Sequence, residues 1–310
     1  MKDPNTATAR PRRRWLTALL YLLAASGVLA LGLTGYAIVG QKKEAPPPTR
    51  VTIDETAVID SVMGETYGKY SAAKKGWLYV ADDNRTYLMR VVQQAKIPDA
   101  ADGDELYFVA SGAATDGREG SLYGVFYVHP TRPHDGGLTQ MNTQVSSRTA
   151  QAVKPEQVHF EALSENLWGW VIRVQEGSDA TSSPVITTNT VLAPHGDAIV
   201  TLGAFMAAID YDPGKPCAEV KTAWDAYAAY ETPQVADEDI EEPEEVLRCE
   251  KRRWSYQTGG VTGAVPVPIT VTAGGTQDGL PVEARKWKLM FDPKSFSYNV
   301  PEELQANRLY

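Results

Sequence analysis

The residues of this chain that are best suited to chemistry are its four histidines, its carboxylates and its two cysteines. His129 and His134 are five positions apart, and two imidazoles could bind zinc there if the intervening loop folded back. Pro130 and Pro133 lie between them, so no helix can present the pair on one face. We therefore expect exposed loop histidines and predict no metal site.

Carboxylates are plentiful, but their spacing indicates no catalytic pair. Asp99, Asp102 and Asp104 loosely resemble a calcium loop, although the spacing does not match that of an EF-hand. Residues 235–245 hold seven acidic side chains, which we interpret as a solvated loop that could also attract divalent ions. A nucleophile elbow, a phosphate loop and a zinc-protease motif are all missing. The sequence thus predicts no catalytic residue, no cofactor and no bound metal.

The two cysteines, Cys217 and Cys249, lie in the same half of the chain. In an oxidising compartment they would pair, and the closed loop would stabilise the fold by about 3–4 kcal/mol. The alternative is two buried free thiols. We predict the disulfide.

Charge is distributed unevenly along the chain. Residues 1–50 carry eight cations and two anions, and residues 51–310 carry the remaining 22 cations and 37 anions, a net charge of −15. So acidic a surface repels phosphate backbones, so we expect no nucleic-acid partner.

Residues 15–40 contain no charged side chain. As a helix this segment would be about 39 Å long, enough to cross a hydrocarbon core of about 30 Å with some tilt. A cleaved signal peptide is the main alternative, but the apolar run continues well past the small residues at 24–26. We predict an uncleaved transmembrane helix, through which this chain has the lipid bilayer as a partner.

The residues that flank this span predict its direction. Five cations lie in the tail 1–14 and three follow the span, so the N-terminus is expected inside and the large domain outside. The natural setting is a bacterial inner membrane, with the domain in the periplasm or outside. Ser26, Ala30 and Thr34 recur every four residues, a small-residue face that would let another membrane helix approach closely.

A short stem at 41–50, rich in proline, leads to residues 51–310, for which we predict an α+β domain, undivided or in two subdomains. It should be mainly antiparallel and β-rich with a few helices. Helices are expected near 53–67, capped by Asp54 or Thr52, and near 82–95 and 222–230, while 198–209 fits a strand or a helix. Candidate strands are 76–80, 105–110, 122–129, 157–163, 168–175, 185–192, 247–257, 265–272 and 287–291.

These features favour a non-enzymatic protein of the cell envelope. A minimal cytoplasmic tail, a short stem and an outward domain without a catalytic motif are typical of a protein-interaction component of an envelope, secretion or pilus-type assembly. Two alternatives stay open: a membrane-tethered hydrolase of an envelope polymer, and an extracytoplasmic ligand sensor that acts through a partner.

Overall fold

The computed structural model describes residues 50–132, 136–147, 151–177, 183–212, 219, 222, 249–278 and 280–306, which belong to one compact unit, Arg50–Tyr310. Their regular structure is almost entirely β, and the named strands pair antiparallel. The prediction of a β-rich, mainly antiparallel fold with few helices is therefore confirmed.

Six strands form the first sheet, and their order in the sheet follows their order in the chain. Such a meander needs only hairpin connections between neighbours. Its members are β1 (Tyr70–Ser71), β2 (Gly76–Val80), β3 (Thr86–Ala100), β4 (Gly103–Ala113), β5 (Ser121–Pro130) and β6 (Leu138–Ser147).

Eight strands form the second sheet, in the order β13-β12-β11-β10-β9-β8-β7, with β14 paired to β12. A short 3-10 helix, η1 (Pro155–Gln157), leads into it. Its members are β7 (Val158–Ser164), β8 (Leu167–Glu176), β9 (Val185–His195), β10 (Ala198–Tyr211), β11 (Glu250–Thr258), β12 (Ile269–Gln277), β13 (Leu280–Pro281) and β14 (Lys286–Leu289).

The second sheet curls until strands far apart in its order meet. The backbone N–H of Val267, just before β12, donates to the carbonyl of Leu163 in β7 at 2.7 Å. The hydroxyls of Tyr256 and Thr258 in β11 donate to the Glu161 carboxylate in β7, at 3.2 and 3.1 Å. Hydrogen bonds between β7 and the region around β11 and β12 thus nearly close the sheet around its own inner face.

The two sheets pack face to face around a shared apolar core. Val125 of the first sheet lies in the same buried cluster as Trp170 of the second. The strand predicted at 168–175 is β8, and one face of this strand supplies to the shared core Trp168, Trp170, Ile172 and Val174.

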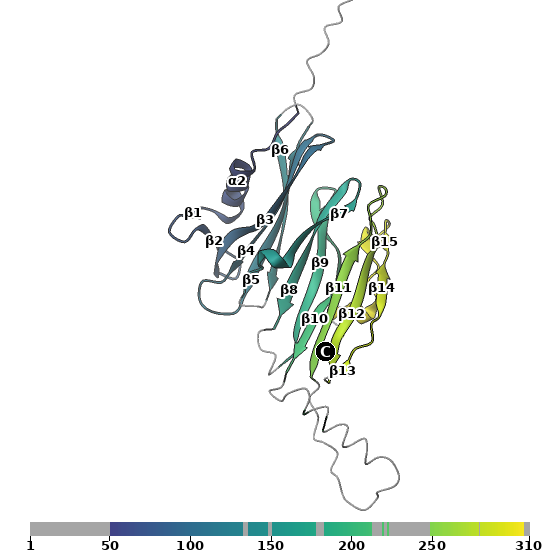
Figure 1. Cartoon of the computed structure of the whole chain (residues 1–310). Helices are drawn as coiled ribbons and strands as arrows, with labels where there is room; N and C mark the ends of the chain where they lie inside the picture. Colours follow the sequence, from purple (N-terminus) through teal and green to yellow (C-terminus); the bar gives the residue numbers. More distant parts are fainter. Residues whose placement is uncertain are drawn as a thin grey trace, which may run out of the picture. The chain divides into compact units, whose positions relative to one another are not determined.

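Each sheet also has a second apolar face, on the side away from the shared core, and each of these faces has its own cover. Figure 1 shows α2 beside the first sheet and the yellow C-terminal segment beside the second. The helix α2 (Glu55–Tyr67) lies on the first sheet, where Met63 and Tyr67 join a cluster with residues of β4 and β5. The C-terminal hairpin β15 (Phe291–Asp292) and β16 (Ser297–Tyr298), with the 3-10 helix η2 (Glu302–Leu304), packs on the inner face of the second sheet. The fold therefore has two sheets between two thin covering layers.

The ends of α2 follow from local sequence. Asp54 is the N-cap, as predicted, and its carboxylate accepts a hydrogen bond from the Ala57 N–H at 3.2 Å. Gly68 ends the helix with φ +85°, and its N–H donates to the Gly64 carbonyl. A residue with a side chain rarely adopts that φ, so glycine is required at this C-cap.

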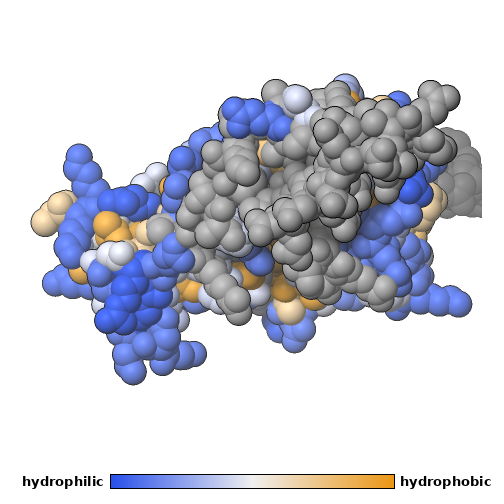
Figure 2. Space-filling model, turned by 90° about the horizontal axis from the view of Figure 1, so that it is seen from below, coloured by the Kyte–Doolittle hydropathy of each residue, from blue (hydrophilic) through white to orange (hydrophobic). Residues whose placement is uncertain are grey.

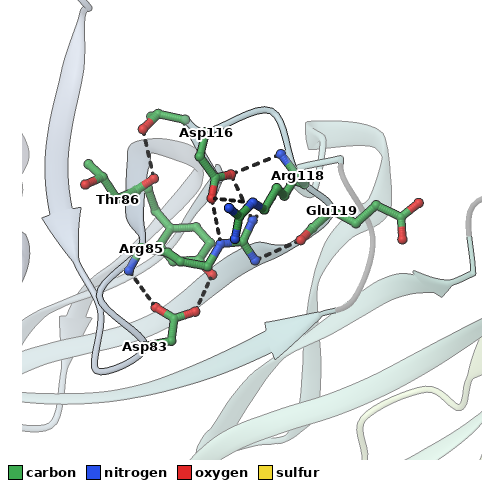
Figure 3. A network of polar contacts seen from close by, with 8 residues as sticks. Asp83, Arg85, Thr86, Asp116, Arg118 and Glu119 are labelled. Carbon is green, nitrogen blue, oxygen red and sulfur yellow. Dashed lines mark hydrogen bonds and ion pairs between the residues drawn. The ribbon is translucent and has the colours of Figure 1, made fainter.

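The second predicted helix, at 82–95, is wrong, because this segment is a turn followed by β3. Asn84 has φ +60°, and the Asp83 carboxylate accepts from the Arg85 N–H at 2.9 Å, which closes a turn where a helix start was expected. Figure 3 shows how the Arg85 guanidinium then reaches across to Asp116, 3.0 Å away, and to the Glu119 carbonyl at 2.8 Å. This network ties the β2–β3 turn to the β4–β5 turn.

Most other expectations for strands are confirmed. The five candidates between 105 and 192 are β4, β5, β7, β8 and β9, and the ambiguous segment 198–209 is strand β10. Sequence reasoning missed β6 entirely. Its ten residues include only three strongly apolar ones, so the alternation gives little signal.

Several predictions fall on residues that the structure does not describe. These are the span 15–40 with its face Ser26, Ala30 and Thr34, the helix at 222–230 apart from Thr222, and the acidic loop 235–245. Among the described residues, no helix has the length and apolar character needed to cross a membrane.

Candidate functional site

The described histidines lie in separate surroundings. His129 in β5 stacks on Tyr127 with ring centroids 4.9 Å apart, and its Nδ1 lies 2.9 Å from the Pro130 carbonyl oxygen. His134 lies outside the described residues. The expectation of an exposed loop histidine is wrong for His129, which is half-buried within strand β5. No group of three or more His, Cys, Asp or Glu side chains within the described ranges is arranged to hold a metal ion.

The loose calcium-loop resemblance does not correspond to a cation site among the described side chains. Asp104 is 8% exposed and forms an ion pair with Lys96 at 2.9 Å, and its carboxylate also accepts from the Ile53 N–H. The hydrogen bond that the Lys96 ammonium donates to Asp104 raises the pKa of Lys96. Asp102 is exposed in the β3–β4 turn, and the Asp99 side chain lies outside the description. Asp104 therefore fastens the start of the domain to the first sheet.

One member of the predicted disulfide is described. Cys249, immediately before β11, is disulfide-bonded, whereas Cys217 lies outside the described residues. Next to it, Arg252 forms an ion pair with Glu250 at 2.9 Å and Arg253 with Asp210 of the neighbouring strand. The two arginines that follow Cys249 thus pair with acids within the sheet.

The surface does not present a broad apolar face where it is visible from below. Figure 2 shows mainly hydrophilic residues there, with small and separate apolar patches. Narrower features of the described residues are candidate sites. Three stand out: a groove under α2, a cleft at the closure of the second sheet, and the free edge of the first sheet.

The first is a groove of about 990 Å³ between α2 and strands β1 to β3, hereafter the α2 groove. Its helix side includes Ile59 and Gly64, and its strand side includes Tyr70, Trp77 and Val91. The Tyr70 and Trp77 rings meet edge to face with centroids 4.9 Å apart. Apolar and aromatic side chains thus line the interior of this groove.

The charged residues of the α2 groove are mostly cationic. Lys69, Lys75 and Arg90 line it, against the single carboxylate of Asp60. The Arg90 guanidinium donates to the carbonyls of Lys74 and Lys75, at 2.9 and 3.0 Å. Arg90 therefore holds the β1–β2 turn in the position from which Lys75 faces the groove.

A smaller cleft of about 530 Å³ lies where the second sheet closes. His159, Glu161, Arg173 and Tyr256 line it. Burial, and then the negative charge of Glu161, raises the pKa of the Tyr256 phenol. Because Glu161 is already engaged by two hydroxyls, its first role is to close the sheet.

Neither described hollow holds the carboxylate pair of a glycosidase or a hydrogen-bonded serine–histidine pair. The α2 groove and the closure cleft are each lined by one carboxylate, Asp60 and Glu161, and a glycosidase uses two. His159 and Ser255 both line the closure cleft, but the described hydrogen bonds include none between them. The described hollows thus lack both a carboxylate pair and a bonded serine–histidine pair.

The third feature is the free edge of the first sheet. β6 pairs with β5 over ten consecutive residues without a register shift, and no other described strand pairs with it. It contains no charged residue and no proline. Charges, prolines and bulges are the usual protections of an exposed edge, and β6 has none of them.

No protein-family model, no curated protein and no solved structure matches the chain.

Proposed function

We propose that this chain is a membrane-anchored, extracytoplasmic protein-interaction component of a bacterial envelope, secretion or pilus-type assembly, and that it binds an extended segment of a partner along β6. The span 15–40 and its arginine-rich flank support the anchoring in the inner membrane. The observation that carries the interaction is the edge of β6, which has no charged residue, no proline and no second strand partner among the described residues.

The hydrogen-bond pattern of the β5–β6 hairpin indicates which backbone groups face outward. The Thr131 N–H donates to the Gly137 carbonyl, and Pro130, which has no N–H, is opposite Leu138. Since hydrogen-bonded and non-bonded pairs alternate in an antiparallel ladder, the even-numbered residues of β6 direct their N–H and C=O away from β5. Asn142 and Gln144 are two of these, at the middle of the strand.

The side chains of β6 define the chemistry of the segment that would bind. On one face, Met141 and Val145 are half-buried against the core between the sheets. On the other face, Gln140, Asn142 and Gln144 are exposed. A partner strand with alternating apolar and polar residues would extend both faces. Main-chain hydrogen bonds would supply affinity and this alternation would supply register.

The test is photo-crosslinking of the full-length chain in cells, with a photoreactive residue in place of Gln144. We expect an adduct with a different protein, in a membrane fraction that resists alkaline carbonate. Asn142→Pro removes one outward N–H to which the partner segment would bond, and should reduce the adduct at least tenfold. The domain should tolerate this change, because edge strands accept proline where the N–H faces solvent. Asn142→Ala is the matched control and should retain the adduct.

A third variant checks the register. Thr143→Pro removes an N–H that bonds to β5 and should destabilise the domain, whereas Asn142→Pro should leave its unfolding midpoint nearly unchanged. An adduct that survives Asn142→Pro would rule out strand addition. An adduct at twice the mass of the chain would make a second copy the occupant and overturn the proposed role in binding other proteins.

A further inference from the structure

We propose that the α2 groove is a binding site for a small amphipathic anion, a molecule with an aromatic or acyl body and one carboxylate or phosphate group. This goes beyond strand addition at β6 and depends on other residues. The argument rests on the open space beside α2, the charge at the groove, the turn that presents it, and the aromatic wall.

The wall of the groove beside α2 is open at two glycines. A Cβ added at Gly64 or Gly68 would meet no atom within 4 Å. Gly68 is required by its positive φ, but Gly64 lies inside the helix, where glycine is among the least favourable residues. Both glycines line the α2 groove. What Gly64 provides is room at the groove wall, one helical turn after Asp60.

The charge at the groove opposes the charge of the domain. Residues 51–310 carry a net charge of −15, yet three cations and one carboxylate line this groove. Lys69 and Lys75 are exposed and form no ion pair among the described residues. Two unpaired ammonium groups beside an aromatic wall would attract an anion and repel a cation.

The turn that carries Lys75 is held in a strained conformation. Lys75 has φ +51°, in the left-handed region that a side chain disfavours. The Arg90 guanidinium bonds to the carbonyls on either side of this position and keeps the turn in place. Strained, over-determined backbone is found disproportionately at ligand sites. Arg90 is therefore a positioning residue for Lys75.

The interior of the groove suits an apolar body of limited size. Tyr70 is 48% exposed although its ring packs edge to face on Trp77, which is itself buried. Ile59 and Val91 complete this apolar lining. Small-molecule sites have volumes of roughly 300–1,000 Å³, and the 990 Å³ groove is at the upper end of that range.

The experiment is calorimetric titration of the full-length chain in zwitterionic lipid nanodiscs, with empty nanodiscs subtracted. The probe is 1-naphthoate, and 1-naphthylmethylammonium has the same rings with the opposite charge. We expect naphthoate to bind at least tenfold more tightly than the cation. No measurable binding of naphthoate, or equal binding of both, would overturn the proposal.

Variants locate the site. Gly64→Leu fills the groove wall and should abolish naphthoate binding, while its better helix propensity raises the thermal midpoint by about 2–4 °C. Ser61→Leu, an exposed α2 position outside the groove, should bind as the wild type does. Naphthoate binding that survives Gly64→Leu would contradict the assignment.

The charge is tested separately, so that the result does not depend on one variant folding. Lys69→Gln with Lys75→Gln should weaken naphthoate binding at least tenfold. Lys286→Gln with Lys288→Gln changes the net charge equally on exposed positions of β14 and should have no effect. Equal weakening by both pairs would reject a local site. If naphthoate binds in zwitterionic nanodiscs but not in nanodiscs of phosphatidylglycerol, lipid headgroups occupy the groove. That result would overturn the proposal that the ligand is a free small molecule.

Discussion

The two sheets of this domain differ in how they treat their edges. The second sheet curls until Glu161 of β7 accepts hydrogen bonds from Tyr256 and Thr258 of β11, and its inner face is filled by the C-terminal segment around Leu304. The first sheet stays open: β6 has one described strand partner, and the α2 cover leaves a groove beside Gly64. Closure removes exposed edges, and an open sheet keeps them available.

This difference suggests a division of roles between the sheets. In the second sheet, the C-terminal segment covers the inner apolar face, and β7 is hydrogen-bonded to the region around β11 and β12. Both proposed binding features, the β6 edge and the α2 groove, belong to the open sheet. The three predictions below test whether the two halves behave as differently as their edges indicate.

The largest effect is expected where the two sheets meet. Trp170 is 1% exposed in the shared core, so Trp170→Ala should lower the free energy of unfolding by about 3–5 kcal/mol, as core aromatic truncations do. Urea unfolding followed by circular dichroism measures this loss. Trp168→Ala, on the same face of β8 but half-buried, should cost less than half as much. Equal losses of unfolding free energy would show that Trp170 stabilises the core between the sheets no more than Trp168 does.

A smaller effect is expected at the closure of the second sheet. Glu161→Gln replaces a carboxylate that accepts two hydroxyl hydrogen bonds, and hydrogen bonds to charged groups contribute about 1.5–3 kcal/mol. Partial exposure reduces this, so we expect a loss of about 1–2 kcal/mol and faster hydrogen exchange around Val267. Glu165→Gln, an exposed neighbour on the same hairpin, should change neither. Unchanged exchange in Glu161→Gln would show that the sheet stays closed without this carboxylate.

The smallest effect concerns pH at the tip of the open sheet. Hydrogen bonds from Arg85, and then from the Arg118 N–H, lower the pKa of Asp116 from 3.8 to about 2. The native state therefore gains stability from this carboxylate above pH 3.8, and loses it as the pH falls through about 2. Carboxyl NMR titration should show that Arg85→Met raises the pKa of Asp116 toward its ordinary value. Arg118→Met should raise it less, and the reverse order would exclude Arg85 as the main cause.

Local sequence predicted the elements whose periodicity had one interpretation. The alternating residues Trp168, Trp170, Ile172 and Val174 gave β8, and Asp54 gave the start of α2. The prediction of a helix at 82–95 was wrong because the apolar residues of this segment fit a helical face as well as a strand. Pairing with β2 and β4 decided the strand, and no local signal reports that pairing.

The candidate sites were less visible still. Nothing near Glu161 in sequence indicates Tyr256, which is 95 residues away. β6 has little apolar alternation, so the strand that carries the interaction proposal was missed. Gly64 lies within the helix expected near 53–67, and nothing in the local sequence indicates a role for it. Its open surroundings become apparent once α2 lies on the strands.

The sequence by itself determined the properties that depend on composition and short-range order. These are an uncharged segment at 15–40, an acidic remainder of net charge −15, and a chain rich in alternating strands. The tertiary structure alone decided which sheet closes and which keeps a free edge. The physical reason is that closure depends on contacts between residues far apart in the chain, such as the hydrogen bond between Val267 and Leu163. The alternation along a strand specifies only which side chains face inward and which face outward.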